Sequence, residues 1–96
     1  MKYSFHPDAE DEFNKAIDYY EDCRTGLGFE FADEVYLAVE RIISYPLSWQ
    51  FLEGEIRRSL VNRFPFGVLY SIEKNEIFII AVMHLHRQPG YWEKRG

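Results

Sequence analysis

The sequence is poor in cysteine and in long apolar runs, and each shortage excludes a class of protein. Among 96 residues there is one cysteine, Cys23, which can form neither an intramolecular disulfide nor a cysteine zinc site. The longest apolar run, residues 77–83, is far shorter than the roughly 20 residues that span a bilayer. The first residues also lack the apolar stretch of a secretory signal, so we expect a cytoplasmic protein without a membrane partner.

What the sequence does contain is charge, divided unevenly between its halves. Residues 1–55 carry four Lys or Arg against 13 Asp or Glu, whereas residues 56–96 carry seven against three. The formal net charge of -5 is therefore an average of an acidic half and a basic half. This asymmetry indicates a basic face that can contact a polyanion.

The length and composition indicate one domain over residues 1–96, because 47% apolar and 18% aromatic side chains suit a single dense core. Alternation of Tyr3 and Phe5 with polar neighbours predicts a strand over residues 2–6. Apolar residues at helical spacing predict helices over 8–24 and 28–45, with Gly26 separating them and Pro46 following the second. We expect these two helices to form an antiparallel hairpin.

Beyond Gly54 the apolar pattern changes to a period of two and predicts strands over 55–62, 67–73 and 76–86. Lys74 and Asn75 predict a tight turn between the last two strands, since Asn tolerates a positive φ. The predicted fold is α+β in the order β-α-α-β-β-β, with the helical hairpin on one face of a four-stranded, mostly antiparallel sheet. Residues 87–96 form a basic and aromatic tail.

Arginines make the second half basic and are the first candidates for binding. Guanidinium groups bind phosphate in a bidentate manner, and aromatic neighbours can stack on bases. The same arginines can instead pair with the acidic helices, and residue types alone leave both interpretations open. The candidate target-binding residues are Arg57, Arg58, Arg63, Arg87 and Trp92.

Two histidines, His84 and His86, are two residues apart and are predicted to lie on one strand face. Such a pair can serve as general acid and base, or it can lie at the edge of the core. The sequence fixes no third ligand, so we predict no metal site. Gly26-Leu27-Gly28 follows a helix and lacks the last glycine of a dinucleotide fingerprint, and we predict neither a cofactor nor a small-molecule substrate.

Taken in order, short motifs along the whole chain resemble the RelE/ParE toxin superfamily, and the ParE-like, plasmid-stabilisation branch best. The motifs are His6-Pro7-x-Ala9, Tyr19-Tyr20-Glu21, Leu27-Gly28, Phe31, Pro46, Ile56-Arg57-Arg58, Arg63-Phe64-Pro65-Phe66, Tyr70, Ala81-Val82-x-His84, Arg87-x-Pro89 and Tyr91-Trp92. The resemblance implies a growth-inhibiting toxin of a type II toxin-antitoxin system, neutralised by a cognate antitoxin.

The resemblance also implies two alternative activities. RelE-like members cut messenger RNA on the ribosome, and for that activity the candidate catalytic residues are His84, His86, Arg87 and Tyr91. Two arginines of such enzymes are replaced here by Gly67 and Leu85. ParE-like members instead bind DNA gyrase, which is the leading hypothesis. A third hypothesis is a degenerate toxin that only binds its antitoxin.

Overall fold

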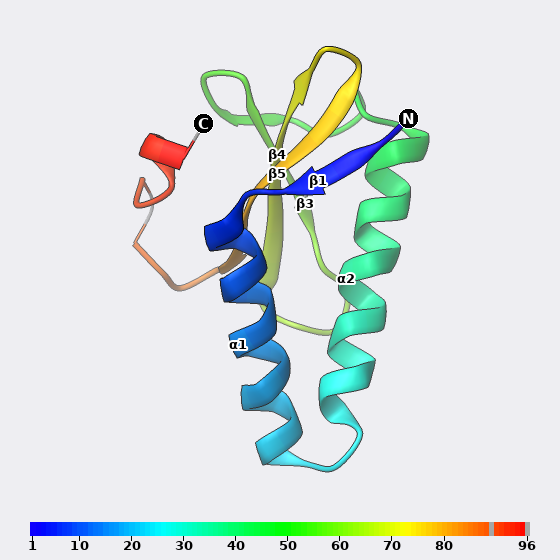
Figure 1. Ribbon diagram of the computed structural model, residues 1–96, viewed down its shortest axis with the longest axis vertical. Coiled ribbons are helices and arrows are strands. Elements are labelled where there is room, and N and C mark those ends of the chain that lie inside the picture. The colour runs from blue at the N-terminus through cyan, green and yellow to red at the C-terminus, as the bar shows by residue number, and fades with distance from the viewer. Residues whose placement is uncertain (89, 96) are drawn as a thin grey trace.

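The computed structural model describes residues 1–88 and 90–95, and its elements follow the predicted order with one additional strand (Figure 1). The elements are β1 (Tyr3–Phe5), α1 (Pro7–Cys23), α2 (Leu27–Ser44), β2 (Phe51–Glu53), β3 (Ile56–Leu60), β4 (Phe66–Glu73), β5 (Glu76–His84) and the short 3-10 helix η1 (Glu93–Arg95). The antiparallel α1–α2 hairpin and the α+β class are confirmed.

Local side-chain contacts explain where α1 begins and how it turns into α2. Pro7 occupies the first helical turn, and the His6 Nδ1 accepts the backbone N–H of Asp8 at 3.0 Å. At the other end, the two carboxylate oxygens of Glu21 accept the N–H groups of Gly26 and Gly28 at 2.9 and 3.0 Å. A Cβ on Gly28 would lie 2.7 Å from the Ile17 carbonyl oxygen, so the close helix approach requires glycine.

The sheet has the strand order β1-β5-β4-β3-β2. β1 pairs with β5 in parallel, and the other pairs are antiparallel. Lys74 and Asn75 have φ values of 52° and 63°, which confirms the predicted tight turn between β4 and β5. A register shift opposite Leu69 and Tyr70 marks a β-bulge in β5.

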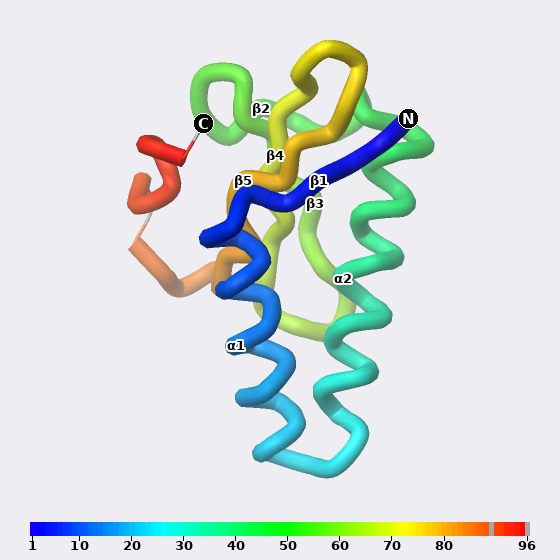
Figure 2. Tube along the Cα trace, in the orientation of Figure 1, coloured from blue at the N-terminus to red at the C-terminus, as the bar shows by residue number. Residues whose placement is uncertain are grey.

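Two apolar clusters lie on opposite faces of this sheet. The helices cover one face, where Phe31, Val39 and Ile42 of α2 pack with Val68 and Tyr70 of β4. The other cluster is smaller and is covered by the tail; it contains Leu69, Ile80, Ala81, Met83 and Trp92. Figure 2 shows η1 on the side of the fold where α1 begins, away from the first residues of the chain.

Several predicted boundaries need correction. The sheet has five strands rather than four, because Phe51–Glu53 pairs with β3 as β2. The predicted strand 55–62 is shorter, at Ile56–Leu60, and the last strand ends at His84, which places His86 in a turn. Pro89 of the Arg87-x-Pro89 motif and Gly96 of the predicted tail lie outside the described residues. Within residues 1–88 and 90–95, no helix is long and apolar enough to cross a membrane.

Candidate binding grooves and the arginines that line them

Two of the predicted target-binding arginines are already engaged within the fold. Arg63 lies 2.7 Å from a Glu30 carboxylate oxygen and 3.8 Å from one of Glu34, so it ties the β3–β4 connection to α2. The hydrogen bond from Arg63 holds the pKa of Glu30 below its usual value. Arg57 donates to the carbonyl oxygens of Leu47 and Trp49, at 3.3 and 2.6 Å, and so holds the loop between α2 and β2.

A third predicted arginine, Arg87, belongs to a cluster around Glu12 of α1. The Glu12 carboxylate is only 12% exposed and lies 3.4 Å from Arg87 and 2.8 Å from Arg95. It also accepts the backbone N–H of Val82, while Arg95 donates to the Ile80 carbonyl oxygen. β1 ends at Phe5 and does not extend along this part of β5. Glu12 and Arg95 therefore provide the hydrogen-bond partners for the Val82 N–H and the Ile80 carbonyl oxygen.

Tyr91, one of the candidate catalytic residues, is part of the same cluster. The guanidinium carbons of Arg87 and Arg95 lie 3.7 and 4.9 Å from the centre of its ring. Its hydroxyl is buried and makes no hydrogen bond to any described residue. Burial, and secondarily the Glu12 carboxylate, raise the pKa of the Tyr91 hydroxyl well above its usual value of 10.0. An ionised, proton-accepting Tyr91 is therefore disfavoured in this arrangement.

The predicted histidine pair does come together, although only His84 is on the strand. The two ring centroids are 5.3 Å apart, and His84 Nδ1 accepts the backbone N–H of His86 at 3.1 Å. A neutral His84 therefore carries its proton on Nε2. The His84 ring also packs edge-on against Phe66, so it lies partly in the core, whereas His86 is exposed.

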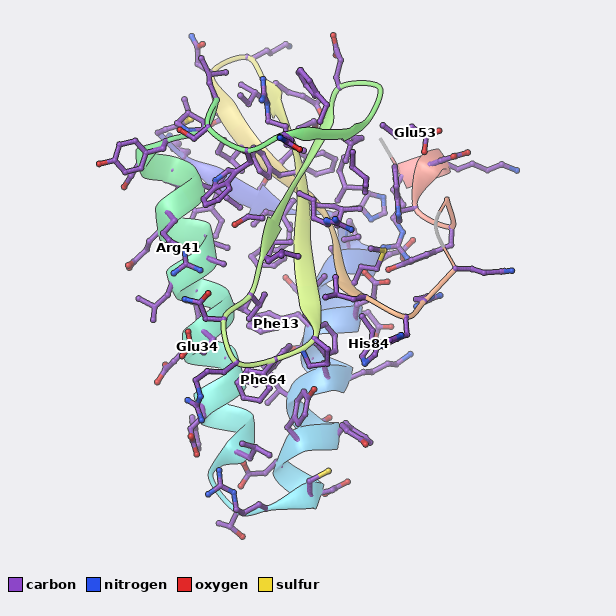
Figure 3. The ribbon with its side chains drawn as sticks, turned by 180° about the vertical axis from the view of Figure 1, so that it is seen from behind. Phe13, Glu34, Arg41, Glu53, Phe64 and His84 are labelled. Atoms are coloured by element: carbon purple, nitrogen blue, oxygen red, sulfur yellow. The ribbon has the colours of Figure 1, made fainter. Side chains whose placement is uncertain are left out.

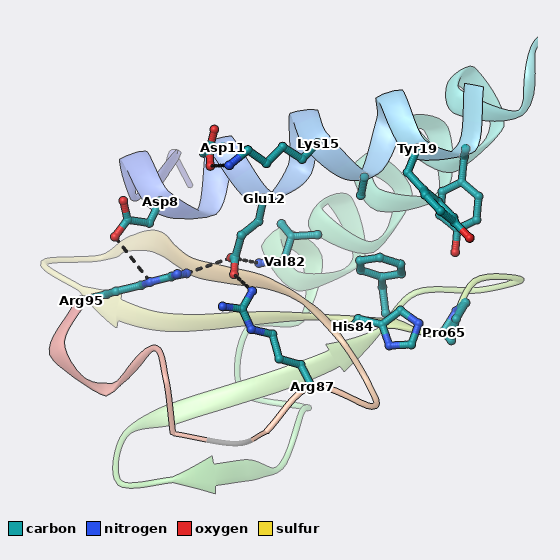
Figure 4. A pocket seen from close by; sticks show the side chains of 13 residues that line it. Asp8, Asp11, Glu12, Lys15, Tyr19, Pro65, Val82, His84, Arg87 and Arg95 are labelled. Carbon is teal, nitrogen blue, oxygen red and sulfur yellow. Dashed lines mark hydrogen bonds and ion pairs between the residues drawn. The ribbon is translucent and has the colours of Figure 1, made fainter. Parts of the chain in front are cut away.

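Glu12, His84 and Arg87 line a groove of about 810 Å³ between α1 and the end of β5, here called the α1 groove (Figure 4). One end is charged, with Asp8, Glu12 and Arg95 joined by ion pairs, and the other end is aromatic. Acidic and basic side chains are balanced along it. The full lining is Asp8, Asp11, Glu12, Lys15, Ala16, Tyr19, Tyr20, Pro65, Phe66, Val82, His84, Arg87 and Arg95.

A second groove, of about 510 Å³, crosses the free edge of β3 and is here called the β3-edge groove. Its charged residues are Arg41 of α2, labelled in Figure 3, and Arg58 of β3. Neither guanidinium has an ion pair or a hydrogen bond within residues 1–88 and 90–95. The other lining residues are Ser48, Trp49, Gln50, Phe51, Leu52, Leu60 and Asn62. No acidic side chain is among them.

Comparison with known proteins decides the family. Residues 3–89 match the family described as the ParE toxin of the type II toxin-antitoxin system parDE. The chain belongs to the ParE toxin family. A solved structure described as a chromosomal ParDE toxin-antitoxin system from P. aeruginosa has the same fold, with a TM-score of 0.78. It shares 13% sequence identity over 90% of this chain and 97% of its own. No curated protein matches the sequence.

Gly67 and Leu85, the two positions at which the resemblance to RelE-like enzymes would place arginines, lie next to each other and to Arg58. At Gly67, where such enzymes carry an arginine, an added Cβ would lie 3.1 Å from the Cγ and Cδ atoms of Arg58. The Arg58 side chain thus lies across Gly67, with Leu85 alongside. The arginine next to Gly67 of β4 is thus Arg58, which belongs to the neighbouring strand β3.

The remaining candidate, Trp92, is not a surface residue. Its side chain is 2% exposed and packs on the sheet face away from the helices, so in this structure it stabilises the tail rather than offering a stacking surface.

The sequence analysis missed Arg41, Glu12 and Arg95. Residue type marked Arg95 as basic, but only the fold shows that it pairs with Glu12, a partner 83 positions away. No set of three or more ligands suited to a metal ion occurs in the described part of the chain.

Proposed function

We propose that this ParE-family chain inhibits growth as a binding toxin directed at DNA gyrase, and that a cognate antitoxin neutralises it. Binding is favoured over catalysis because two of the candidate catalytic residues, Arg87 and Tyr91, are already held by contacts within the fold. Arg87 pairs with Glu12 and stacks on Tyr91, and the Tyr91 hydroxyl is buried with a raised pKa. A nuclease needs a free base and free cations next to the scissile phosphate.

Arg58 is the predicted target-binding arginine best placed to make such a contact. Arg57, Arg63 and Arg87 each have a partner in the fold, whereas Arg58 has none within the described residues. Arg41 adds a second positive charge in the same groove. An arginine without an internal partner can pair with an outside acid or phosphate without first breaking a contact.

A supercoiling assay tests this proposal directly. Relaxed circular DNA, gyrase and ATP are incubated with purified toxin, and the expected result is loss of supercoiled product. The Arg58→Ala variant should inhibit less, while Lys2→Ala removes a charge at the opposite sheet edge and should inhibit as the parent does. Full gyrase activity at about 10 μM toxin, well above a typical specific affinity, would overturn the gyrase target.

The second candidate function is a ribosome-dependent endoribonuclease, and the observation that favours it is the proximity of His84, which lines the α1 groove, to His86. Induced expression followed by mapping of transcript ends tests it. Cut transcripts that disappear in His86→Ala would support this function. Intact transcripts, with His86→Ala and Tyr91→Phe still toxic, would exclude it.

If induction of the parent chain does not slow growth, the degenerate, antitoxin-binding alternative is supported instead.

A further inference from the structure

We propose that the β3-edge groove binds an extended acidic peptide segment, which pairs with the free edge of β3 while its carboxylates contact Arg41 and Arg58. This inference deepens the proposed function, under which the segment belongs to the antitoxin. Three features of the groove support it: an unpaired strand edge, two arginines without partners among the described residues, and an apolar rim.

The strand edge is open because β2 is short. β2 reaches β3 only at Ile56 and Arg57, and Gln50 accepts the N–H of Arg58 at 3.4 Å. The N–H of Val61 faces β4, where it donates to the Phe66 carbonyl oxygen. Because successive backbone groups alternate in direction, the N–H and C=O of Leu60 face outward, into the groove. They are the groups to which an added strand would bind.

The two arginines lie on different walls of this edge. Arg58 is opposite Leu69 in the sheet register, on the face away from the helices, whereas Arg41 comes from α2 on the helix side. In an extended segment, successive side chains point to opposite faces. Acidic residues on either face of the added strand would therefore meet one of these guanidinium groups.

The rim of the groove favours a peptide over a nucleic acid. Leu52, Leu60 and Phe51 are 38%, 53% and 56% exposed, and the buried indole N–H of Trp49 has no partner among the described residues. A peptide can offer apolar side chains to this rim and backbone groups to Leu60, whereas a phosphate backbone offers neither. The α1 groove, by comparison, has its charges paired internally and its exposed β5 groups capped by Glu12 and Arg95.

Binding can be measured on the full chain with a fluorescein-labelled synthetic peptide of about eight residues in which Glu-Glu and Val-Val pairs alternate, so that each face of the strand carries glutamates. Fluorescence anisotropy should show binding that weakens as salt is raised. The Arg41→Ala and Arg58→Ala double variant should bind about tenfold more weakly, while Lys2→Ala should bind as the parent does. Equal binding by the parent and the double variant would overturn the proposal.

Two further probes separate strand pairing from simple charge attraction. A peptide with alternate backbone amides N-methylated keeps its charge but loses edge hydrogen bonds, and it should not bind. In the unsubstituted chain, the peptide should slow hydrogen exchange at the Leu60 amide and leave the Val82 amide unchanged. Equal binding of the methylated peptide, or protection at β1 instead of Leu60, would overturn the assignment to this edge. Tighter binding of single-stranded DNA, lost in the double variant, would overturn it in favour of a nucleic acid.

These measurements are independent of the gyrase assay. A toxin that inhibits gyrase but does not bind the peptide retains the proposed function and loses this inference. A toxin that binds the peptide at β3 but leaves gyrase unaffected retains the docking site and loses the proposed target.

Discussion

The two grooves differ in how their arginines are used. In the α1 groove, Arg87 and Arg95 share the Glu12 carboxylate, and they fix the tail to the first helix. In the β3-edge groove, Arg41 and Arg58 have no partner within the described residues. The same residue type is thus paired within the fold in one groove and has no partner among the described residues in the other. The number of basic residues does not distinguish these uses, whereas the pairing of each guanidinium does.

The largest expected effect is a loss of stability where the tail packs on the sheet. Trp92→Ala should lower the free energy of unfolding by about 3–5 kcal/mol, because it removes a large buried side chain from the sheet face that the tail covers. Urea denaturation followed by circular dichroism measures the change. Tyr19→Ala, at a ring that is 65% exposed, is the control and should cost far less. Equal losses for the two variants would contradict the assignment of Trp92 to the core.

The next effect concerns the shared carboxylate. Glu12→Gln should cost about 3 kcal/mol, because Arg95, 13% exposed, is left beside an uncharged amide. Hydrogen exchange at the Val82 amide should become faster, since its acceptor is weakened. Glu10→Gln, on an exposed part of the same helix, is the matched control. If both variants are equally stable, the cluster does not hold the tail.

Raised pH should weaken the contact between β4 and the loop after α2, the loop that supplies Ser48 and Trp49 to the β3-edge groove. The buried Tyr70 hydroxyl donates to the Pro46 carbonyl oxygen at 2.7 Å, and burial raises the pKa of Tyr70 from 10.0 to about 12. The folded state therefore holds this proton more tightly than the unfolded state does, so the stabilisation is complete below pH 10 and is lost as pH rises toward about 12. Each tenfold difference in proton affinity between the two states contributes about 1.4 kcal/mol to this loss.

Urea denaturation at a series of pH values measures this loss. Tyr70→Phe should cost about 1 kcal/mol at pH 7, through the hydrogen bond, and should flatten the pH dependence above 10. The slope that remains should come from the other groups whose pKa is raised, among them Tyr20 and Tyr91. An unchanged slope in Tyr70→Phe would contradict the role of Tyr70.

The smallest expected effect completes the comparison. Arg58→Ala should lower the free energy of unfolding by no more than about 1 kcal/mol, because it removes the packing of the side-chain stem over Gly67 but leaves no buried acid without a partner. Arg95→Ala should cost several times more, since it leaves the buried Glu12 carboxylate without its nearest cation. Thermal melts of the two variants, recorded together, measure the difference. Equal melting temperatures would remove the distinction between the two edges.

The sequence predicted those parts of the fold that depend on local patterns. Apolar spacing indicated both helices and the three long strands, and Lys74 and Asn75 indicated the tight turn. β2 was missed because its three residues are all exposed and carry no clear alternation. His86 was placed on a strand because the apolar pattern gives no sign that pairing ends at His84.

The candidate site was less predictable, because its chemistry depends on partners that are distant in the sequence. The sequence shows that Arg57 and Arg63 are basic, but it does not show their partners. In the fold, Arg57 donates to backbone carbonyl groups of residues 47–49, and Arg63 pairs with Glu30. The arginines therefore differ in pairing: Arg57, Arg63 and Arg87 have partners in the fold, and Arg58 has none among the described residues. Arg41 was overlooked because it lies on a helix whose other charged residues are acidic.

The bond between Glu12 and Arg95 also has a consequence for how the protein is made. Glu12 leaves the ribosome long before its partner, which follows 83 positions later. Trp92, which covers the outer face of the sheet, is synthesised almost as late. The helical hairpin can form while translation continues, but the sheet face away from the helices remains uncovered until residues 92–95 have emerged. A premature stop codon before Trp92 would therefore yield a chain with an exposed apolar face, which is a substrate for quality-control proteases.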